Sequence, residues 1–273
     1  MIKRITKKFK KMLTTKNIVA KEIPVLYGTQ LSDKIVLITG ASSGIGFGIA
    51  QAIISNGGKV IITGRDTEKL NNACKSLGEN ARYLEWDASS TSLLETNLEN
   101  AIKIFGRIDA LINNAGYHGN QDFLTITESD YNNTFDTNLK FVFFLSQAIS
   151  KYFIKNKIEG NILNISSASS MKPAWSPYEI SKWGVRGFTR GLARELAPHG
   201  IVVNGIAPGP CATQMSNYKE GDFLNWNNIP SGRMSLPIEI GNLAVFLISS
   251  AGRNILGETI FCDGGSGLLT MNK

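Results

Sequence analysis

The pair Tyr178 and Lys182 is the feature of this sequence that most directly suggests chemistry. Residues four positions apart on a helix lie on one face, so the phenol and the ammonium are expected to be neighbours. A free phenol has a pKa of about 10, and lowering it to about 7 requires about 4 kcal/mol. One cation about 4 Å away, at an effective dielectric constant of about 20, supplies an interaction of that size. The pair is compatible with a phenol that exchanges a proton with a ligand, although Tyr-x-x-x-Lys taken alone also occurs by chance on helix surfaces.

A glycine-rich turn follows the first apolar run of the chain. Residues 39–46 contain the spacing Gly-x-x-x-Gly-x-Gly and lead into a helical pattern. Glycines let the backbone turn sharply and approach a ligand closely, while amides at the helix start favour a phosphate group. The turn predicts a dinucleotide site, although a tight connection without a ligand has the same local pattern. The candidate residues are Gly40, Ser42, Ser43, Gly44, Ile45 and Gly46.

The elements that would position these residues alternate from residue 31 onward. The expected strands are residues 34–39, 59–63, 81–85, 108–113, 161–166, 201–206 and 258–262. The expected helices are residues 44–56, 66–77, 90–105, 128–153, 176–197 and 237–249. This alternation predicts an α/β protein with a Rossmann-like, doubly wound, mostly parallel seven-stranded sheet and helices on both faces. Its ligand crevice would lie at the carboxyl ends of the strands.

The net charge of +7 is concentrated at the N-terminus. Residues 1–16 hold seven Lys or Arg and no acid, which leaves 22 basic and 22 acidic residues in the rest of the chain. A general nucleic-acid footprint is therefore not expected. We interpret residues 1–31 as a basic extension, with an apolar helical stripe within residues 1–16, and residues 32–273 as one catalytic domain. The stripe is compatible with a membrane surface, an acidic partner, an organelle-targeting role or a frayed terminus.

Other sequence features bear on location and on metal binding. The longest uncharged stretch, residues 35–58, contains six glycines, so a strand, turn and helix explain it better than a membrane span. Three widely spaced cysteines favour reduced thiols and a cytoplasmic protein, peripheral at most to a membrane. His118 and His199 have no metal-like spacing. We expect them to be ordinary surface residues, and we expect no metal site.

Seven short signatures in order make the chain resemble the short-chain dehydrogenase/reductase family over about residues 31–265. Besides the glycine turn they are Asn113–Gly116, Asn138, Ile165–Ser167, Tyr178–Lys182, Pro208–Gly209 with Thr213, and Asp263–Gly265. The resemblance implies an enzyme that interconverts a carbonyl and a secondary alcohol by hydride transfer with a nicotinamide dinucleotide. It also implies a homodimer or homotetramer that pairs through the helices at about residues 128–153 and 176–197.

The resemblance assigns roles to four catalytic candidates. Tyr178 would be the proton donor or acceptor, and Lys182 would also bind the nicotinamide ribose. The substrate-holding serine is placed at Ser167, the second of its pair, with Ser166, Ser169 and Ser170 as competitors because the spacing to Tyr178 is short. Asn138 would fix a water that connects Lys182 to solvent. The alternative for Asn138 is a buried amide that bridges backbone groups.

The choice of cofactor depends on the end of the second strand. An acidic residue there would bind an unphosphorylated ribose, but the position holds Gly64 followed by Arg65, whose guanidinium suits a 2′-phosphate. We therefore predict NADP, with NAD less favoured, and expect Asp66 to cap the next helix. Asp87 is placed near the adenine, and Asn114 is expected to tie its loop down. The remaining cofactor-binding candidates are Asn113, Gly116, Tyr178, Lys182, Pro208, Gly209 and Thr213.

The substrate itself is not identified by the sequence. The stretch between Gly209 and Arg233 is rich in aromatic side chains, which suggests an apolar or ring-bearing substrate under a lid, or packing against another subunit. Trp175 and Tyr117 are candidates for the same pocket. Two rival functions remain open at this point. One is a 3-oxoacyl carrier-protein reductase with a basic docking surface, and the other is a cofactor-binding scaffold or sensor without turnover.

Overall fold

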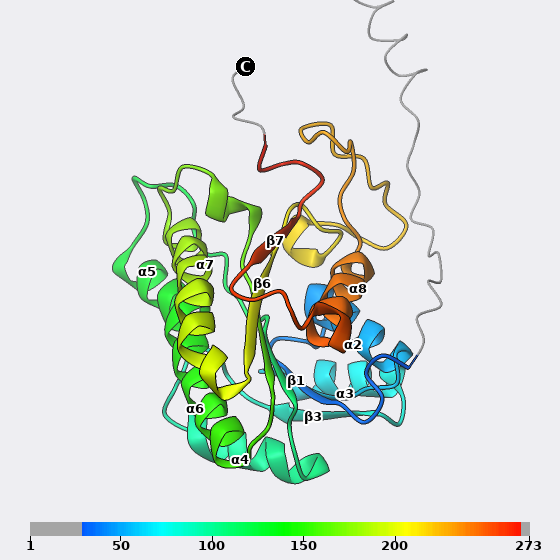
Figure 1. Cartoon of the computed structure of the whole chain (residues 1–273). Helices are drawn as coiled ribbons and strands as arrows, with labels where there is room; N and C mark the ends of the chain where they lie inside the picture. Colours follow the sequence, from blue (N-terminus) through cyan, green and yellow to red (C-terminus); the bar gives the residue numbers. More distant parts are fainter. Residues whose placement is uncertain (1–28, 269–273) are drawn as a thin grey trace, which may run out of the picture.

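A seven-stranded sheet forms the centre of the computed structural model, which describes residues 29–268 (Figure 1). The spatial order is β3-β2-β1-β4-β5-β6-β7, and every neighbouring pair is parallel. The strands are β1 (Ile35–Ile38), β2 (Lys59–Gly64), β3 (Ala81–Glu85), β4 (Ala110–Asn113), β5 (Asn161–Ile165), β6 (Val202–Pro208) and β7 (Thr259–Cys262). The predicted fold class is confirmed.

Helices cover both faces of this sheet (Figure 1). The helices are α2 (Gly44–Ser55), α3 (Thr67–Leu77), α4 (Leu94–Phe105), α5 (Glu128–Phe135), α6 (Phe141–Lys155), α7 (Pro177–Leu196) and α8 (Pro237–Ile248). One core contains side chains of α2, α3 and α8, and the other contains side chains of α4, α6 and α7. All four residues of β1 are apolar because both faces of the strand are covered. Val36 and Ile38 enter the first core, while Ile35 and Leu37 enter the second.

Two glycines allow α2 and α8 to approach closely. A Cβ at Gly241 would lie 2.5 Å from the carbonyl oxygen of Gly48, and a Cβ at Gly48 would lie 2.5 Å from Cβ of Pro237. Only glycine leaves room for this contact without moving backbone. The contact fixes the axis of α2, whose first residue belongs to the glycine-rich turn.

The helix predicted over residues 128–153 is interrupted. It consists of α5, a π-helical turn at Asp136–Lys140, and α6. Asn138 lies in that turn and is 1% exposed. A π turn inserts one extra residue per turn, and such turns are frequent at functional sites. It changes the direction of the side chains that follow, so the single continuous helix was a wrong prediction.

The described chain begins at Thr29, and Leu31 already belongs to the folded domain. The Leu31 side chain is fully buried in the first core, and its amide donates to the carbonyl of Asn56 at 3.0 Å. The predicted extension therefore ends before residue 31, because an apolar side chain at that position closes the core. The expected amphipathic helix and its contacts through residues 1–16 lie outside the described residues.

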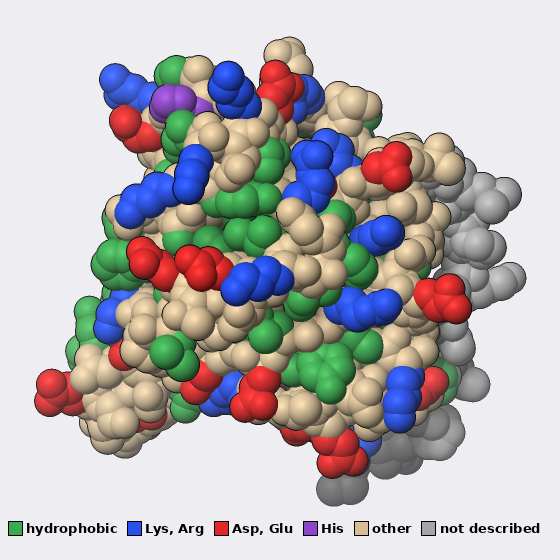
Figure 2. Space-filling model, turned by 90° about the horizontal axis from the view of Figure 1, so that it is seen from below, with side chains coloured by type: hydrophobic (Ala, Val, Ile, Leu, Met, Phe, Trp, Pro, Cys, Tyr) green, Lys and Arg blue, Asp and Glu red, His purple; other side chains and the backbone are tan. Residues whose placement is uncertain are grey.

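Two surface properties bear on the binding of large partners. Between residues 29 and 268, none of the helices combines the length and the apolar character that crossing a membrane requires. Seen from the amino ends of the strands, the surface shows Lys and Arg interspersed with Asp and Glu instead of one basic patch (Figure 2).

Candidate active site

A cleft of about 360 Å³ lies at the carboxyl edge of the sheet. The strand order places it where β1 and β4 are neighbours, because the chain leaves these two strands towards opposite sides of the sheet. Its walls come from the glycine turn after β1, the ends of β2 and β3, the loop after β4, the end of β5 and the start of α7. The cleft contains both Tyr178 and Lys182, so the topology unites the two sequence signals.

The glycine turn is built as its spacing predicts. Gly40 and Gly44 have φ of 64° and 59°, which favour glycine. A Cβ at Gly40 would lie 2.8 Å from Cα of Ala115, and one at Gly46 would lie 2.5 Å from Nδ2 of Asn114. The Asn114 amide donates to the carbonyls of Thr39 and Gly40 at 2.9 and 2.8 Å. The turn and the loop after β4 are thereby locked together, and Asn114 ties its loop down as expected.

The start of α2 suits an anion. Ser43 occupies the N-cap position without a side-chain capping bond, and the first turn contains no acidic residue. The first N–H groups of a helix lack partners within the helix and carry the positive end of its dipole. Ser42, Ser43, Gly44 and Ile45 all line the cleft, so these donors are available to a diphosphate there.

The opposite end of the cleft contains Gly64, Arg65 and Asp87. Asp66 is engaged elsewhere, since its carboxylate caps α3 by accepting from the amide of Lys69 at 3.0 Å. Asp87 accepts from the amide of Ser89 at 2.9 Å. Arg65 is therefore the cation at the end of the cleft where the adenosine of a dinucleotide would bind. The residues of the cleft fit a dinucleotide in donors and in charge.

Tyr178 and Lys182 are neighbours on α7, but their electrostatics differ from the one-cation expectation. Lys182 Nζ lies 5.6 Å from the centre of the Tyr178 ring and donates to the carbonyl of Ile165 at 3.0 Å. Burial lowers the pKa of Lys182 to about 8. Burial also raises the pKa of Tyr178, which a hydrogen bond with Ser167 lowers and the Glu179 carboxylate raises further. Desolvation is thus the largest effect on the pKa of Tyr178, and the expectation based on one nearby cation did not include it.

The two serines of the pair have different surroundings. Ser166 is 4% exposed, and its hydroxyl donates to the carbonyl of Lys182 at 2.9 Å, which anchors α7. Ser167 accepts from the amide of Ser169 at 3.1 Å. Ser170 is buried and donates to the carbonyl of Ser167 at 2.7 Å. Of these serines, Ser167 is the one that lowers the pKa of the Tyr178 phenol.

Asn138 holds the loop after β4. Its side chain accepts from the amide of Tyr117 at 2.7 Å and donates to the carbonyl of Tyr117 at 2.9 Å and to Ser181 Oγ at 3.1 Å. These bonds satisfy the amide in the manner of the alternative considered from sequence, a buried side chain that bridges backbone groups.

Four cofactor candidates are not among the residues that line the cleft. The Asn113 side chain points into the core, where it donates to Ser146 Oγ at 3.0 Å and Asn164 Oδ1 at 2.8 Å. Pro208 is buried at the end of β6. A Cβ at Gly209 would lie 2.7 Å from Cα of Asp263, so Gly209 permits close packing against the segment after β7. Gly46 likewise serves packing, whereas Gly116 and Thr213 line the cleft.

Thr213 and Gln214 separate the cleft from a larger cavity of about 740 Å³. That cavity is walled by apolar side chains of α2, the segment after β6 and the start of α8, among them Phe47, Tyr218 and Ile238. Neither Tyr178 nor Lys182 belongs to its lining, so the proton-transfer groups are in the smaller space.

His118 is exposed, as expected, but it also contacts the site, which the sequence reasoning missed. Its ring centre lies 4.6 Å from that of Tyr178, with the two planes tilted by 52°. Burial lowers the pKa of His118, against opposing effects of the Glu179 carboxylate and the backbone of Gly119. The available signal was its position in the chain, two residues after Gly116 of the cofactor loop.

Comparisons with known proteins agree with this geometry. The family model described as short chain dehydrogenase matches residues 34–222. The 3-oxoacyl-[acyl-carrier-protein] reductase FabG of Salmonella typhimurium is 35% identical over 85% of this chain and 96% of its own. The 2-dehydro-3-deoxy-D-gluconate 5-dehydrogenase of Escherichia coli is 35% identical over 88% and 98%. The crystal structure of a 3-ketoacyl-(acyl-carrier-protein) reductase from Brucella melitensis, complexed with NADH, matches with a TM-score of 0.80 and 30% identity over 86% and 99%.

The family model covers more than half of the chain, and the curated relatives match almost along their full lengths. The fold, the glycine turn and the Tyr178–Lys182 pair found above are the features that the resemblance predicted. The chain therefore belongs to the short-chain dehydrogenase/reductase family and is an oxidoreductase that acts on CH–OH or keto groups.

Proposed function

We propose that the protein is an NADP-dependent oxidoreductase that interconverts a ketone and a secondary alcohol, with Tyr178 as proton donor in reduction and acceptor in oxidation. One observation carries this proposal. Tyr178 and Lys182 share the cleft of the glycine turn, and Ser167 is close enough to the phenol to lower its pKa. A scaffold without turnover would have no need for a serine hydroxyl that acts on a phenol beside a buried ammonium.

The binding roles follow from the lining of the cleft. A nicotinamide dinucleotide would supply or accept the hydride. Gly44 and the first amides of α2 would hold its diphosphate, and Lys182 would bind the hydroxyls of its nicotinamide ribose. Arg65 would bind at the adenosine end.

The chain's own residues would handle the proton. Ser167 orients the substrate oxygen by a hydrogen bond, and Tyr178 gives its phenolic proton to that oxygen as negative charge develops there. Lys182, with a pKa of about 8, exchanges protons close to neutral pH and so can return one to Tyr178 between turnovers. The buried position of Lys182 thus serves the reaction although it disfavours the charged ammonium.

NADP is favoured over NAD by the residues at the end of β2. Gly64 offers no carboxylate for a ribose hydroxyl, and Asp66 is occupied by capping α3. Arg65 lines the cleft and can pair with a 2′-phosphate. We expect Arg65→Asp to lower kcat/KM for NADPH at least tenfold while that for NADH changes little. An unchanged ratio of the two kcat/KM values would show that Arg65 does not select the cofactor.

A second candidate is a 3-oxoacyl-[acyl-carrier-protein] reductase, because proteins with that name are about 35% identical to this chain. Acetoacetyl coenzyme A and acetoacetyl-acyl carrier protein distinguish the two functions. A kcat/KM at least tenfold higher for the carrier-bound thioester than for the coenzyme A thioester would favour the second candidate. Equal values would leave carrier recognition without support.

The direct test of the proposed reaction is NADPH oxidation at 340 nm with a panel of neutral and charged ketones. We expect turnover with at least one ketone and formation of the corresponding alcohol. Tyr131→Phe is a suitable control for variants of the catalytic tyrosine, since Tyr131 is 45% exposed and stacks on Phe135 of the same helix. Tight binding of NADPH with no turnover on any ketone would favour a sensor instead.

We also propose that the protein pairs through α6 and α7. These helices expose large apolar side chains, namely Phe143 (43%), Phe144 (42%), Ile180 (44%) and Trp183 (43%). Exposed apolar side chains gathered on neighbouring helices mark an interaction surface. Light scattering of the purified chain should give the mass of a dimer or tetramer, and Phe144→Glu should lower that mass. A monomeric wild type would contradict the proposal.

For residues 1–16 we propose a peripheral contact of a cytoplasmic protein with an anionic membrane surface, based on their charge. Deleting residues 1–25 should abolish sedimentation with vesicles that contain phosphatidylserine and leave turnover unchanged. Equal sedimentation of both proteins would remove this proposal.

A further inference from the structure

Aromatic rings lie at the substrate end of the cleft. Tyr178 and Tyr117, which is 39% exposed, line the cleft, and the exposed ring of His118 lies against Tyr178 with ring centres 4.6 Å apart. We call Tyr117, His118 and Tyr178 the ring slot. The slot lies beside the phenol that would protonate the substrate, so a group attached to the reacting carbonyl would contact it.

The loop that contributes His118 is fixed to the rest of the domain. The Asn138 side chain clamps Tyr117 at both its amide and its carbonyl. The Gln121 side chain donates to the carbonyl of His118 and accepts from Ser176 Oγ at 2.6 Å. The slot is therefore held between the π-helical turn and the start of α7, and its shape is set before a substrate arrives.

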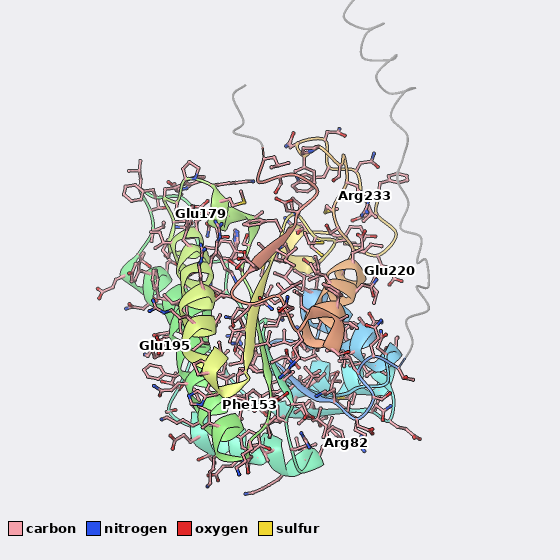
Figure 3. The ribbon with its side chains drawn as sticks, in the orientation of Figure 1. Arg82, Phe153, Glu179, Glu195, Glu220 and Arg233 are labelled. Atoms are coloured by element: carbon pink, nitrogen blue, oxygen red, sulfur yellow. The ribbon has the colours of Figure 1, made fainter. Side chains whose placement is uncertain are left out.

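The charge around the slot is negative. The Glu179 carboxylate is 9% exposed and accepts from the amides of Trp175 and Ser176 at 3.0 and 3.1 Å and from Ser176 Oγ at 3.1 Å. Within residues 29–268 it has no ion-pair partner. Figure 3 shows Glu179 at the end of α7 that lies beside the carboxyl ends of the strands. Its field reaches both His118 and Tyr178.

The slot has no cation of its own to balance Glu179. Among the described residues that line the cleft, the cations are Lys182 and Arg65, and the proposed function uses both for the dinucleotide. Partial burial lowers the pKa of His118, which disfavours the charged form of its imidazole. A carboxylate or phosphate bound in the slot would lose water and meet only the like charge of Glu179.

From this arrangement we infer that the substrate is a neutral ketone, or its alcohol, that carries a flat apolar group packed against His118 and Tyr117, and that anionic carbonyl compounds are rejected. The inference rests on the proposed function and names its substrate class. It separates this chain from its Escherichia coli relative, whose name denotes a dehydrogenase of a sugar acid.

Binding of two matched probes tests the inference without turnover. Acetophenone and 4-acetylbenzoate differ by one carboxylate, and neither can react when the wild-type protein is loaded with NADP⁺. Calorimetry should show at least tenfold tighter binding of acetophenone. Equal affinities, tighter binding of 4-acetylbenzoate, or no binding of either probe would overturn the inference. Because no reaction is needed, a preference for acetophenone in a protein that reduces no ketone would refute the proposed function and leave the inference standing.

Variants identify the groups responsible. His118→Ala should weaken acetophenone binding about tenfold through the lost ring contact. Glu179→Gln keeps the acceptor for the cap of α7 but removes the charge, so the preference for acetophenone should shrink at least threefold. Glu195→Gln is the matched control, because Glu195 is exposed on the same helix (Figure 3) about 24 Å from Glu179. It should change neither affinity.

A second variant keeps the test decisive if Glu179→Gln does not fold. His118→Lys places a cation in the slot, and it should improve binding of 4-acetylbenzoate at least tenfold and weaken that of acetophenone. If 4-acetylbenzoate binds no better to His118→Lys than to the wild type, the site of the carboxylate is not the ring slot and the inference fails.

Discussion

Replacing Lys182 by Met should stabilise the protein and abolish its activity. Lys182 is 4% exposed, and its pKa falls from 10.5 to about 8 because burial disfavours the ammonium. That difference corresponds to about 3 kcal/mol of destabilisation when the ammonium is charged. Lys182→Met removes this term but also removes the hydrogen bond to the carbonyl of Ile165, which is worth about 1 kcal/mol. The net gain is about 2 kcal/mol in the free energy of unfolding at pH 7.

The pH dependence of this gain follows from the lowered pKa. Below pH 8 Lys182 is charged in the folded and the unfolded chain, so the destabilisation is fully present. Between pH 8 and 10.5 the unfolded chain binds more protons than the folded one, so the wild type gains stability as pH rises. The excess in the free energy of unfolding of Lys182→Met over the wild type should therefore shrink between pH 8 and 10.5. Above that range the variant should be slightly less stable than the wild type.

Thermal and urea unfolding of the ligand-free proteins at pH 7 and pH 10 measure this difference. At pH 7 the melting temperature of Lys182→Met should exceed that of the wild type by about 4–8 °C. Lys151→Met, at an exposed position of α6, is the control and should change stability little. A variant that is less stable than the wild type at pH 7, or whose advantage is the same at both pH values, would refute the reasoning.

Two further pairs of variants test packing and the serine assignment. Gly241→Ala should lower the free energy of unfolding by about 2 kcal/mol, because its Cβ would lie 2.5 Å from the carbonyl of Gly48. Gly187→Ala, on α7 with nothing within 4 Å, should raise that free energy by about 0.5–1 kcal/mol in the same urea titration. Ser167→Ala should lower kcat about 100-fold, whereas Ser166→Ala should leave kcat nearly unchanged and destabilise by about 1–2 kcal/mol. If Ser166→Ala instead lowered kcat and Ser167→Ala lowered only stability, Ser166 would be the catalytic serine.

Most of the fold could be predicted because each element has a local cause. The strand at Ile35–Ile38 is apolar at every position, as a strand covered on both faces must be. The π-helical turn at Asp136–Lys140 could not be predicted, because its residues are compatible with an ordinary helix. The turn depends on tertiary contacts, because it places the side-chain amide of Asn138 within hydrogen-bond distance of Tyr117 and Ser181.

The site was predictable where spacing alone brings groups together. Tyr178 and Lys182 are neighbours because helix geometry makes them so. The choice between Asn113 and Asn114 was not predictable, since adjacent residues at a strand end point to opposite sides and only the packing of Asn113 against Ser146 and Asn164 decides.

The position of His118 depends on contacts that are distant in sequence. Gln121 connects its loop to Ser176, 55 residues further along the chain, and this bond brings the loop beside α7. The pKa of Tyr178 was also beyond sequence reasoning, because the desolvation of a phenol depends on how completely the fold covers it. Sequence spacing thus identified the proton-transfer pair but not the environment that tunes it.

The most direct test of the account is the turnover of Tyr178→Phe with NADPH and a ketone that the wild type reduces. The ring and its contact with His118 remain in this variant, so NADPH affinity should change less than about twofold while kcat falls by about 100-fold or more. A Tyr178→Phe protein that turns over at the wild-type rate would contradict the central claim that this phenol delivers the proton.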